Sequence, residues 1–401
     1  MKDNRRRSQM GEMGIINIVD IPNYLTIEAL EDGLTASLSV NACEYCVDGD
    51  GNWKSLDAGI NTEAISTGHT LSFRGNITPD STNGIGTFGI SKLCNLKGNC
   101  LSILYGDDAE GKTVSKYGFY KLFKSCTNIV SVSDDFLSSN KVDTYSYSQM
   151  FYGCTSLIKV PNLPFTNGNA SYCCAEMFYE CTALRSLPSD LLDKCTSVGY
   201  GGFGYMFYGC TALVSAMAKI PIKTLNTSCY QYMFANCTSL KNAPELPATV
   251  LKGNCYRYMF RGCSSLIKIP ELNISSVDTY CCYNMFRACT SLVEAQDILP
   301  ATTLANFCYS YMFYGCTKLT KSPILPALTL NSSSYAYMFN GCKLLNNITM
   351  LATDVSATSC LNSWVSGVAS TGTFIKNPAM NDLPSGTSGI PAGWTVENYV
   401  E

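Results

Sequence analysis

Cysteine and histidine are the side chains of this sequence that could do metal or nucleophilic chemistry. There are 22 cysteines among 401 residues but a single histidine, His69. A Ser-His-Asp or Cys-His arrangement would have to use His69, and a histidine-rich metal site is excluded. Because His69 directly precedes a strand-like run at 70–74, we expect it in a turn or on the surface. Any site chemistry of this chain would therefore have to come from thiols.

Four cysteines near the N-terminus have the spacing of metal ligands. Cys43 and Cys46 are three residues apart, as in many zinc sites, and Cys94 and Cys100 are candidate partners. The segment reads as a strand, however, and residues three apart on a strand point to opposite faces, which opposes chelation. We expect no metal here and no other cofactor.

Two further patterns resemble catalytic or nucleotide-binding motifs. The glycine-rich run at 199–204 has no strand–loop–helix unit around it, and it reads as an irregular coil. The adjacent acids at 107–108 and 134–135 lack a recurring context and read as loop charges. We expect that the protein is not an enzyme.

Charge and hydropathy narrow the classes of partner. The 28 basic and 31 acidic residues leave a net charge of −3, which is no basis for binding nucleic acid. The apolar runs are far shorter than the roughly 20 residues that cross a bilayer. The apolar stretch at 14–19 is interrupted by Asn17 and is too short for a signal peptide, so we expect cytosolic synthesis and free thiols.

The motif Met-Phe-x-x-Cys recurs along most of the chain. A degenerate first copy starts at Leu122 and a last one at Trp364, and successive copies are 26 to 29 residues apart. Such a period predicts a solenoid, with about 26–28 residues per coil, from about residue 113 to 376. The expected buried ladder is Met150, Cys154, Met177, Cys181, Met206, Cys210, Met233, Cys237, Met259, Cys263, Met285, Cys289, Met312, Cys316, Met338 and Cys342.

Each coil reads as a short helix followed by an extended segment. Cys255, Met259 and Cys263 are four residues apart, so a helix would place them on one face, flanked by Tyr256 and Phe260. The proline-punctuated run that follows suits a strand pairing with the neighbouring coil. The cysteines then read as small buried apolar residues in ladders; the alternative is a stack of disulfides or bound metals.

A helical wheel places the residue before the methionine, and the second residue after it, on the outside. Such a tyrosine and arginine stripe is a candidate surface for contacts with protein or glycan; the alternative is stacking between coils for stability alone. A second, more polar candidate surface is the extended face. The stripe residues are Tyr205, Tyr232, Tyr258, Arg261, Arg287, Tyr311, Tyr314 and Tyr337, and the extended face carries Lys159, Lys268, Glu294 and Lys321.

Units such as Met-Phe-Tyr-Gly-Cys-Thr-Ser-Leu at 150–157, joined by segments such as Leu-Pro-Ala-Thr-Thr-Leu at 299–304, resemble the BspA-like leucine-rich repeats. That family occurs in surface proteins of Bacteroidetes and in phages and prophages of those bacteria. The resemblance implies a binding or structural protein. Joined with the expected cytosolic synthesis, it favours a virion component; the alternative is a bacterial cell-surface adhesin.

The predicted fold class is an α/β repeat solenoid with a small N-terminal all-β domain and a C-terminal cap. The expected divisions are an extended basic arm at 1–20, a β domain with an adaptor at 21–112, the solenoid at 113–376 and the cap at 377–401. The N-terminal region is expected to attach the protein to other virion or surface proteins, in several copies, while the solenoid contacts a host-surface protein or glycan.

Overall fold

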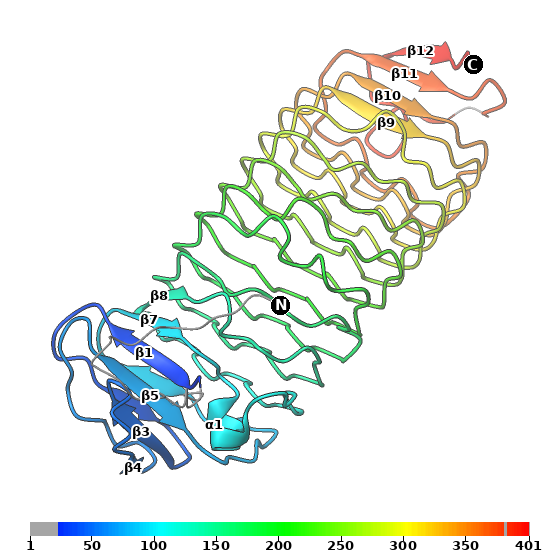
Figure 1. Cartoon of the computed structure of the whole chain (residues 1–401). Coiled ribbons are helices and arrows are strands. Elements are labelled where there is room, and N and C mark those ends of the chain that lie inside the picture. Colours follow the sequence, from blue (N-terminus) through cyan, green and yellow to red (C-terminus); the bar gives the residue numbers. More distant parts are fainter. Residues whose placement is uncertain (1–22, 381–382, 401) are drawn as a thin grey trace, which may run out of the picture.

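The computed structural model of the chain describes residues 23–380 and 383–400, so the arm expected at 1–20 lies outside the described residues. The molecule is an elongated stack of coils with a strand-rich unit at its N-terminal end and a short parallel sheet at its C-terminal end (Figure 1). No helix in these described ranges is long and apolar enough to cross a membrane.

The N-terminal unit is built on a sheet whose strand order is β4-β3-β5-β1-β7-β8, with a separate pair formed by β2 and β6. A four-residue helix, α1 (Ser102–Tyr105), and a 3₁₀ turn (Gly106–Asp108) pack beside it. The unit therefore differs from the all-β domain that the sequence predicted. Alternating burial along β1 places its apolar side chains in the core. The strands are β1 (Leu25–Ala29), β2 (Ala36–Leu38), β3 (Cys43–Val47), β4 (Lys54–Leu56), β5 (Thr70–Arg74), β6 (Phe88–Ile90), β7 (Cys94–Lys97) and β8 (Ile129–Val132).

The N-terminal unit is continuous with the solenoid. β7 pairs antiparallel with β1 on one side and parallel with β8 on the other, and β8 belongs to the first coil. Phe88 of β6 also takes the place of a repeat phenylalanine. Its N–H donates to the Leu122 carbonyl at 2.7 Å, and its ring stacks on Phe123 with centroids 5.3 Å apart. The N-terminal unit therefore covers the open first coil.

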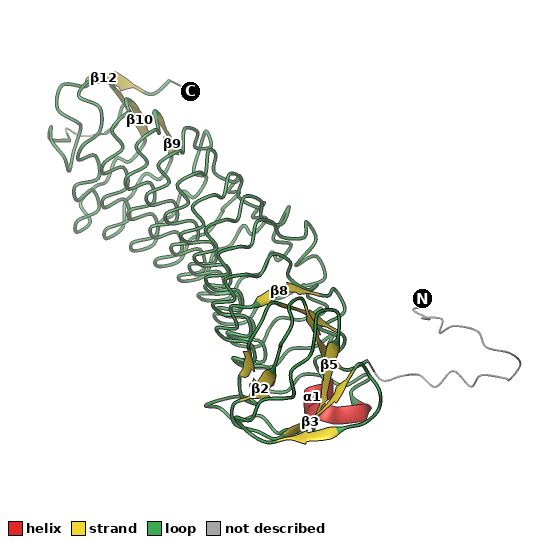
Figure 2. Ribbon diagram, turned by 90° about the vertical axis from the view of Figure 1, so that its left-hand side faces the viewer, coloured by secondary structure: helices red, strands yellow, loops and turns green. Residues whose placement is uncertain are grey.

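The Met-Phe segments are not helices, and in this respect the predicted α/β fold class was wrong. Every fourth residue of each segment has a positive φ; around Met233 these are Ser228, Tyr232 and Asn236, with φ of 57°, 57° and 60°. A right-handed helix needs negative φ at every residue. Figure 2 accordingly shows the coils as loops and turns with a few short strands, and the helix that it draws lies in the N-terminal unit.

Hydrogen bonds explain this conformation. Along one segment the N–H groups alternate: that of Met233 donates to the Tyr230 carbonyl within its own coil at 3.1 Å, and that of Phe234 donates to the Met259 carbonyl of the next coil at 2.9 Å. The result is a series of overlapping four-residue turns, stacked on the neighbouring coil. We call the stretch from five residues before to four residues after each motif methionine the turn segment. In the first and last coils, Leu122 and Trp364 take the place of this methionine.

Turn segments bury residues in pairs, with two inward positions followed by two outward positions. Cys229, Met233 and Cys237 are completely buried, as are Tyr230 and Phe234. Burial in the turn segments repeats every four residues, which is close to the 3.6 residues per turn of a helix. The helical wheel therefore still selected the right inward residues. All members of the methionine and cysteine ladder expected from the sequence are buried.

Phenylalanine rings form the spine of the core. The ring of Phe260 lies between those of Phe234 and Phe286, with centroids 5.7 and 5.6 Å apart and ring planes within 3° of parallel. The stack runs through Phe123 to Phe88 in one direction, and in the other it ends where Phe339 meets Trp364 in the last coil. Stacking at this spacing adds to the burial of apolar area and fixes the distance between coils.

Opposite the turn segments, the coils pair in parallel through isolated bridges such as Asn242 to Lys268 and Lys268 to Glu294. Full strands form at the C-terminal end in the order β9-β10-β11-β12. Residues 387–389 meet the last turn segment: the Thr387 carbonyl accepts from Val365 N–H at 3.2 Å, and the Gly389 carbonyl accepts from Trp364 Nε1 at 2.8 Å. These last four strands are β9 (Lys321–Leu325), β10 (Asn347–Met350), β11 (Thr373–Lys376) and β12 (Thr395–Asn398).

Candidate binding surface on the turn segments

Tyrosine side chains on the outer side of the turn segments stack from coil to coil. Tyr232 lies between Tyr205 and Tyr258, with ring centroids 4.5 and 4.3 Å apart. Tyr311 and Tyr337 form a similar pair at 4.5 Å. These five residues are half-buried, and each is in the left-handed region of backbone conformation that the turn segment requires at the position before the methionine. The structure therefore gathers them into two stacked groups along one line, separated by the coil of Met285, where Asn284 takes this position.

A second column lies beside the first. Tyr152, Tyr179 and Tyr208 stack with centroid distances of 4.4 and 4.6 Å, and Tyr208 also approaches Tyr205 at 5.9 Å. Because the faces of stacked rings cover one another, the columns present ring edges and phenol hydroxyls to solvent. Flat stacking of a ligand on these rings is therefore restricted to the ends of each column.

Arginines join the tyrosine columns in the coils of Met259 and Met285. The guanidinium groups of Arg257 and Arg261 lie 5.2 and 5.5 Å from the ring centre of Tyr258. Arg257 is also within 5.4 Å of the Tyr280 and Tyr283 ring centres. Cation–π contacts of this kind hold the guanidinium groups in place.

Arg287 repeats this arrangement one coil further along. Its guanidinium lies 4.6 Å from the Tyr314 ring centre and 5.8 Å from that of Tyr311. Its Nη1 donates to Asn284 Oδ1 at 3.2 Å, just as Arg257 Nη1 donates to Asn254 Oδ1 at 3.1 Å. The arginines are thus oriented by hydrogen bonds to an asparagine as well as by tyrosine rings.

Burial raises the pKa of the tyrosine hydroxyls on this surface. Partial desolvation is the largest cause of the raised pKa of Tyr205 and of Tyr311, and neighbouring phenols add to it. The pKa of Tyr232 is raised as well, by burial and by the neighbouring Tyr258 and Tyr205. At the ordinary tyrosine pKa of 10.0 these hydroxyls are already protonated around neutral pH, and the shift keeps them so at higher pH, where they can still donate hydrogen bonds to a ligand.

The helical wheel missed three residues of this surface, namely Arg257, Tyr280 and Tyr283. It assigned only the position before the methionine and the second position after it to the outside. In the four-residue turn pattern the positions two and five before the methionine also face outward. The sequence signal was the regular alternation of two apolar and two polar positions, which a period of four describes better than one of 3.6.

The extended face is a weaker candidate because its charges partly neutralise one another. Lys159 lies 3.1 Å from Asp134, and Lys268 lies 4.0 Å from Glu294 across neighbouring coils. Lys321 is exposed at the start of β9. A groove of about 610 Å³ opens on this face, and its lining includes Lys268, Glu271, Glu294, Asp297 and Lys321.

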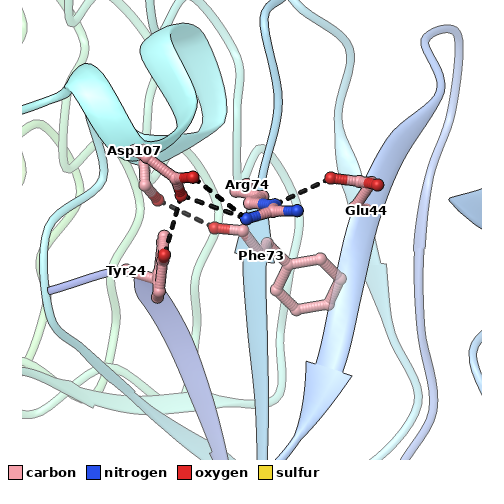
Figure 3. Close-up of polar contacts among 6 residues, drawn as sticks. Tyr24, Glu44, Phe73, Arg74 and Asp107 are labelled. Carbon is pink, nitrogen blue, oxygen red and sulfur yellow. Dashed lines mark hydrogen bonds and ion pairs between the residues drawn. The ribbon is translucent and has the colours of Figure 1, made fainter. Parts of the chain in front are cut away.

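A polar cluster in the N-terminal unit connects the sheet to the turn after α1 (Figure 3). Arg74 Nε donates to Glu44 at 2.7 Å, and Nη1 donates to both oxygens of Asp107 at 3.1 Å. Tyr24 donates its hydroxyl proton to Asp107 at 2.7 Å. Burial, and then Asp107, raises the pKa of Tyr24 to about 12. The guanidinium also lies 4.2 Å from the Trp53 ring centre, so its contacts are all internal and structural.

Within the part of the chain that the structure describes, His69 pairs with one acid and the N-terminal cysteines are buried. His69 Nδ1 lies 2.6 Å from an oxygen of Asp48, and both side chains are about half exposed. Cys43 and Cys46 are buried in β3. Among residues 23–380 and 383–400 no group of three histidine, cysteine, aspartate or glutamate side chains is placed to hold a metal.

All 22 cysteines are free and buried. The ladder cysteine at the end of each turn segment donates its thiol hydrogen to the phenylalanine carbonyl of the preceding coil, as Cys237 does to Phe207 at 3.1 Å. Burial raises the pKa of Cys210 and of Cys342 from an ordinary 9.0 to about 12. The reactive thiolate is therefore disfavoured, and these cysteines serve as packing and hydrogen-bonding groups.

Comparison with known proteins found two matches. The family model of the BspA type leucine rich repeat region matches in six copies, at residues 112–252, 175–320 and 256–363. A crystal structure of a leucine-rich repeat protein from Bacteroides ovatus ATCC 8483 matches 70% of this chain and 77% of its own chain, with 16% identity and a TM-score of 0.33. No curated protein matches at a significant level. Since the family model covers more than half of its length, the chain belongs to the BspA-type leucine-rich repeat proteins.

Proposed function

We propose that the protein is a non-enzymatic binding protein that contacts a surface protein or glycan through the tyrosine and arginine side chains of its turn segments. The observation that carries this proposal is the stack of Tyr205, Tyr232 and Tyr258, which continues into the arginine-bearing coils. Tyrosine and arginine are the residue types enriched in contact surfaces. A rigid column of them costs little ordering entropy on binding.

A binding role suits the family as well as the surface. BspA-type repeats generally act in adhesin-like protein binding and not in catalysis. The outward side of the turn segments, which we call the turn surface, offers hydrogen-bond donors, ring edges and fixed positive charge over several coils. The thiols of the turn segments, in contrast, are buried. These are the properties of a recognition surface.

The place of action is either the surface of a bacterial cell or a phage virion. The family favours the cell surface, because BspA-type proteins of Bacteroidetes are often surface-associated. The 22 buried free thiols favour the virion, because they suit folding in a reducing cytoplasm before display. In both cases residues 1–112 would attach the protein, and residues 377–401 would close the far end of the solenoid.

Flow cytometry with the fluorescently labelled protein tests the binding surface. We expect a Tyr205→Ser/Tyr232→Ser/Tyr258→Ser variant to lose most of its binding to cultured epithelial cells and to Bacteroides cells. The matched control is a triple variant of the extended face, Lys159→Ser/Lys268→Ser/Lys321→Ser, which should bind as the unmodified protein does. Equal binding by the two variants would reject the turn surface.

Location and attachment need separate measurements. Mass spectrometry of purified phage particles and protease treatment of intact host cells distinguish a virion protein from a cell-surface protein. Deleting residues 1–20 should release the protein from its particle or cell without changing the thermal unfolding of the solenoid. If the deletion variant stays attached while the tyrosine variant does not, the solenoid and not the N-terminal region is the docking part.

A further inference from the structure

We propose that Arg257, Arg261 and Arg287, with the tyrosines that hold them, bind the acidic groups of an anionic oligosaccharide. We call these arginines together with Tyr258, Tyr283 and Tyr311 the arginine–tyrosine patch. This inference rests on the proposed function and names the class of ligand that this part of the turn surface recognises.

The three guanidinium groups are close together and preorganised. Arg257 and Arg261 contact the same ring, that of Tyr258, at 5.2 and 5.5 Å from its centre. The Tyr283 ring lies 5.5 Å from Tyr258 and 5.5 Å from Tyr311, whose ring Arg287 approaches at 5.8 Å. One chain of rings therefore connects all three arginines. Little side-chain entropy remains to be lost when a ligand binds.

None of the three has an ion-pair partner within the described residues. The ion pairs found there lie in the N-terminal unit and on the extended face. Arg257 and Arg287 each use one hydrogen bond on a neutral asparagine, and Arg257 Nε is buried without a hydrogen-bond partner. Guanidinium groups held in this way have donors free for sulfate or carboxylate oxygens, which they bind in a bidentate manner.

The charge of the turn surface differs from that of the whole protein. Its outward positions in the ten coils carry five basic residues and only two acidic ones, although the protein as a whole has a net charge of −3. The acids are Glu176 and Glu180, in the coil of Met177, so none lies at an outward position of the turn segments of Met259 and Met285. The local field around the patch therefore attracts an anion.

The backbone argues for an oligosaccharide over an acidic peptide. Consecutive N–H groups from Tyr256 to Gly262 donate either to a carbonyl of their own coil or to the next coil, so an extended peptide cannot add as a further strand. Recognition is left to guanidinium groups, phenol hydroxyls and the positive edges of stacked rings. Hydroxyl and acidic groups displayed along a saccharide chain match that set.

Isothermal titration calorimetry with four probes tests the proposal. They are a heparin-derived hexasaccharide, which is sulfated, an oligogalacturonate hexamer, which is carboxylated, a neutral cello-hexaose and a hexaglutamate peptide. We expect binding of at least one anionic saccharide, weakened by added salt, and no binding of cello-hexaose. The two anionic saccharides distinguish sulfate from carboxylate as the group recognised.

Variants assign the binding to the patch. Arg261→Gln/Arg287→Gln should weaken binding of the anionic saccharide by about tenfold or more, because each charge-assisted hydrogen bond contributes substantially. The matched control Lys268→Gln/Lys321→Gln removes two exposed charges from the extended face and should leave the affinity unchanged. Circular dichroism melting of both variants excludes unfolding as the cause.

Four results would overturn the inference: no binding of either anionic saccharide, unchanged affinity in the arginine variant, binding of cello-hexaose as tight as that of the anionic saccharides, or a preference for hexaglutamate. Failure of the proposed function is a separate outcome. In that case, the tyrosine variant of the cytometry experiment would bind cells normally. A protein that binds cells through its tyrosines but ignores both anionic saccharides would keep the proposed function and lose this inference.

Discussion

The thiol of Cys263 donates a hydrogen bond to the carbonyl of Phe234, one coil back, at 3.1 Å. The same carbonyl accepts the N–H of Cys237 at 3.2 Å within its own coil. Eight further coil junctions repeat the thiol-to-phenylalanine bond, from Cys126 to Cys342, all between 2.9 and 3.3 Å. A residue that packs as a small apolar group thus also connects successive coils.

The thiol bond predicts an order of stability among substitutions of Cys263. Cys263→Ala should lower the free energy of unfolding by about 1–3 kcal/mol, because it removes both the buried sulfur and the donor. Cys263→Ser should cost less, since its hydroxyl can donate to the same carbonyl. Urea unfolding followed by circular dichroism measures both. A serine variant less stable than the alanine variant would show that sulfur acts here only as an apolar filler.

Glycine substitutions distinguish the turn segment from a helix by the sign of their effect. Gly315 has φ of 71°, and a Cβ there would have room, with its nearest neighbour 3.9 Å away. Gly315→Ala should therefore destabilise the protein by about 1–2 kcal/mol through backbone strain alone. In a helix the same change would stabilise it.

The reverse change at Ala288 is the matched control. This residue occupies the equivalent position of the preceding coil with φ of 60°. Ala288→Gly should raise the thermal unfolding midpoint, because glycine adopts positive φ without strain. Opposite shifts for the two substitutions support the turn geometry, and a stabilising Gly315→Ala would contradict it.

Core and surface positions of one turn segment should respond very differently to truncation. Met259 and Phe260 are completely buried, so replacing either by alanine should cost about 2–5 kcal/mol through loss of packing and formation of a cavity. Arg261→Ala should cost little, because its side chain lies on the outside. Denaturant midpoints of the three variants provide the test; equal midpoints would reject the inward and outward assignment.

Stability should fall at alkaline pH. Burial raises the pKa of Cys229 and of Cys263 from 9.0 to about 12. Between these values the unfolded chain loses thiol protons that the folded protein keeps, so the unfolded state binds fewer protons and the free energy of unfolding declines as pH rises above about 9. We expect a nearly constant thermal midpoint from pH 6 to 8 and a steep fall beyond pH 9.

Thiol counting complements the pH profile. The native protein at pH 8 should react slowly with Ellman's reagent, whereas denaturant without reductant should expose the 22 thiols. Recovery of only a few thiols after unfolding would mean that disulfides exist and would contradict the buried, reduced ladder. Fast reaction of the folded protein would contradict the protection by burial.

Much of the architecture could be predicted from the sequence because it is encoded locally in every coil. The recurring Met-Phe-x-x-Cys motif defined the coils, and the spacing of Cys255, Met259 and Cys263 identified the inward residues whatever the exact backbone conformation. The same repetition placed Tyr232 and Tyr258 at equivalent positions, one coil apart. Position in the repeat is a property of the chain alone.

The conformation of the turn segments was decided only by tertiary structure. A lone segment with residues four apart on one face would satisfy its N–H groups as a helix. Stacked coils offer the N–H of Phe234 a carbonyl at Met259, and this non-local partner makes a positive φ at every fourth residue favourable. The outward positions of Arg257 and Tyr283 follow from that geometry. The pairing of Phe88 with Leu122 likewise joins segments that share no repeat, because an open first coil must bury its apolar side and satisfy its carbonyls.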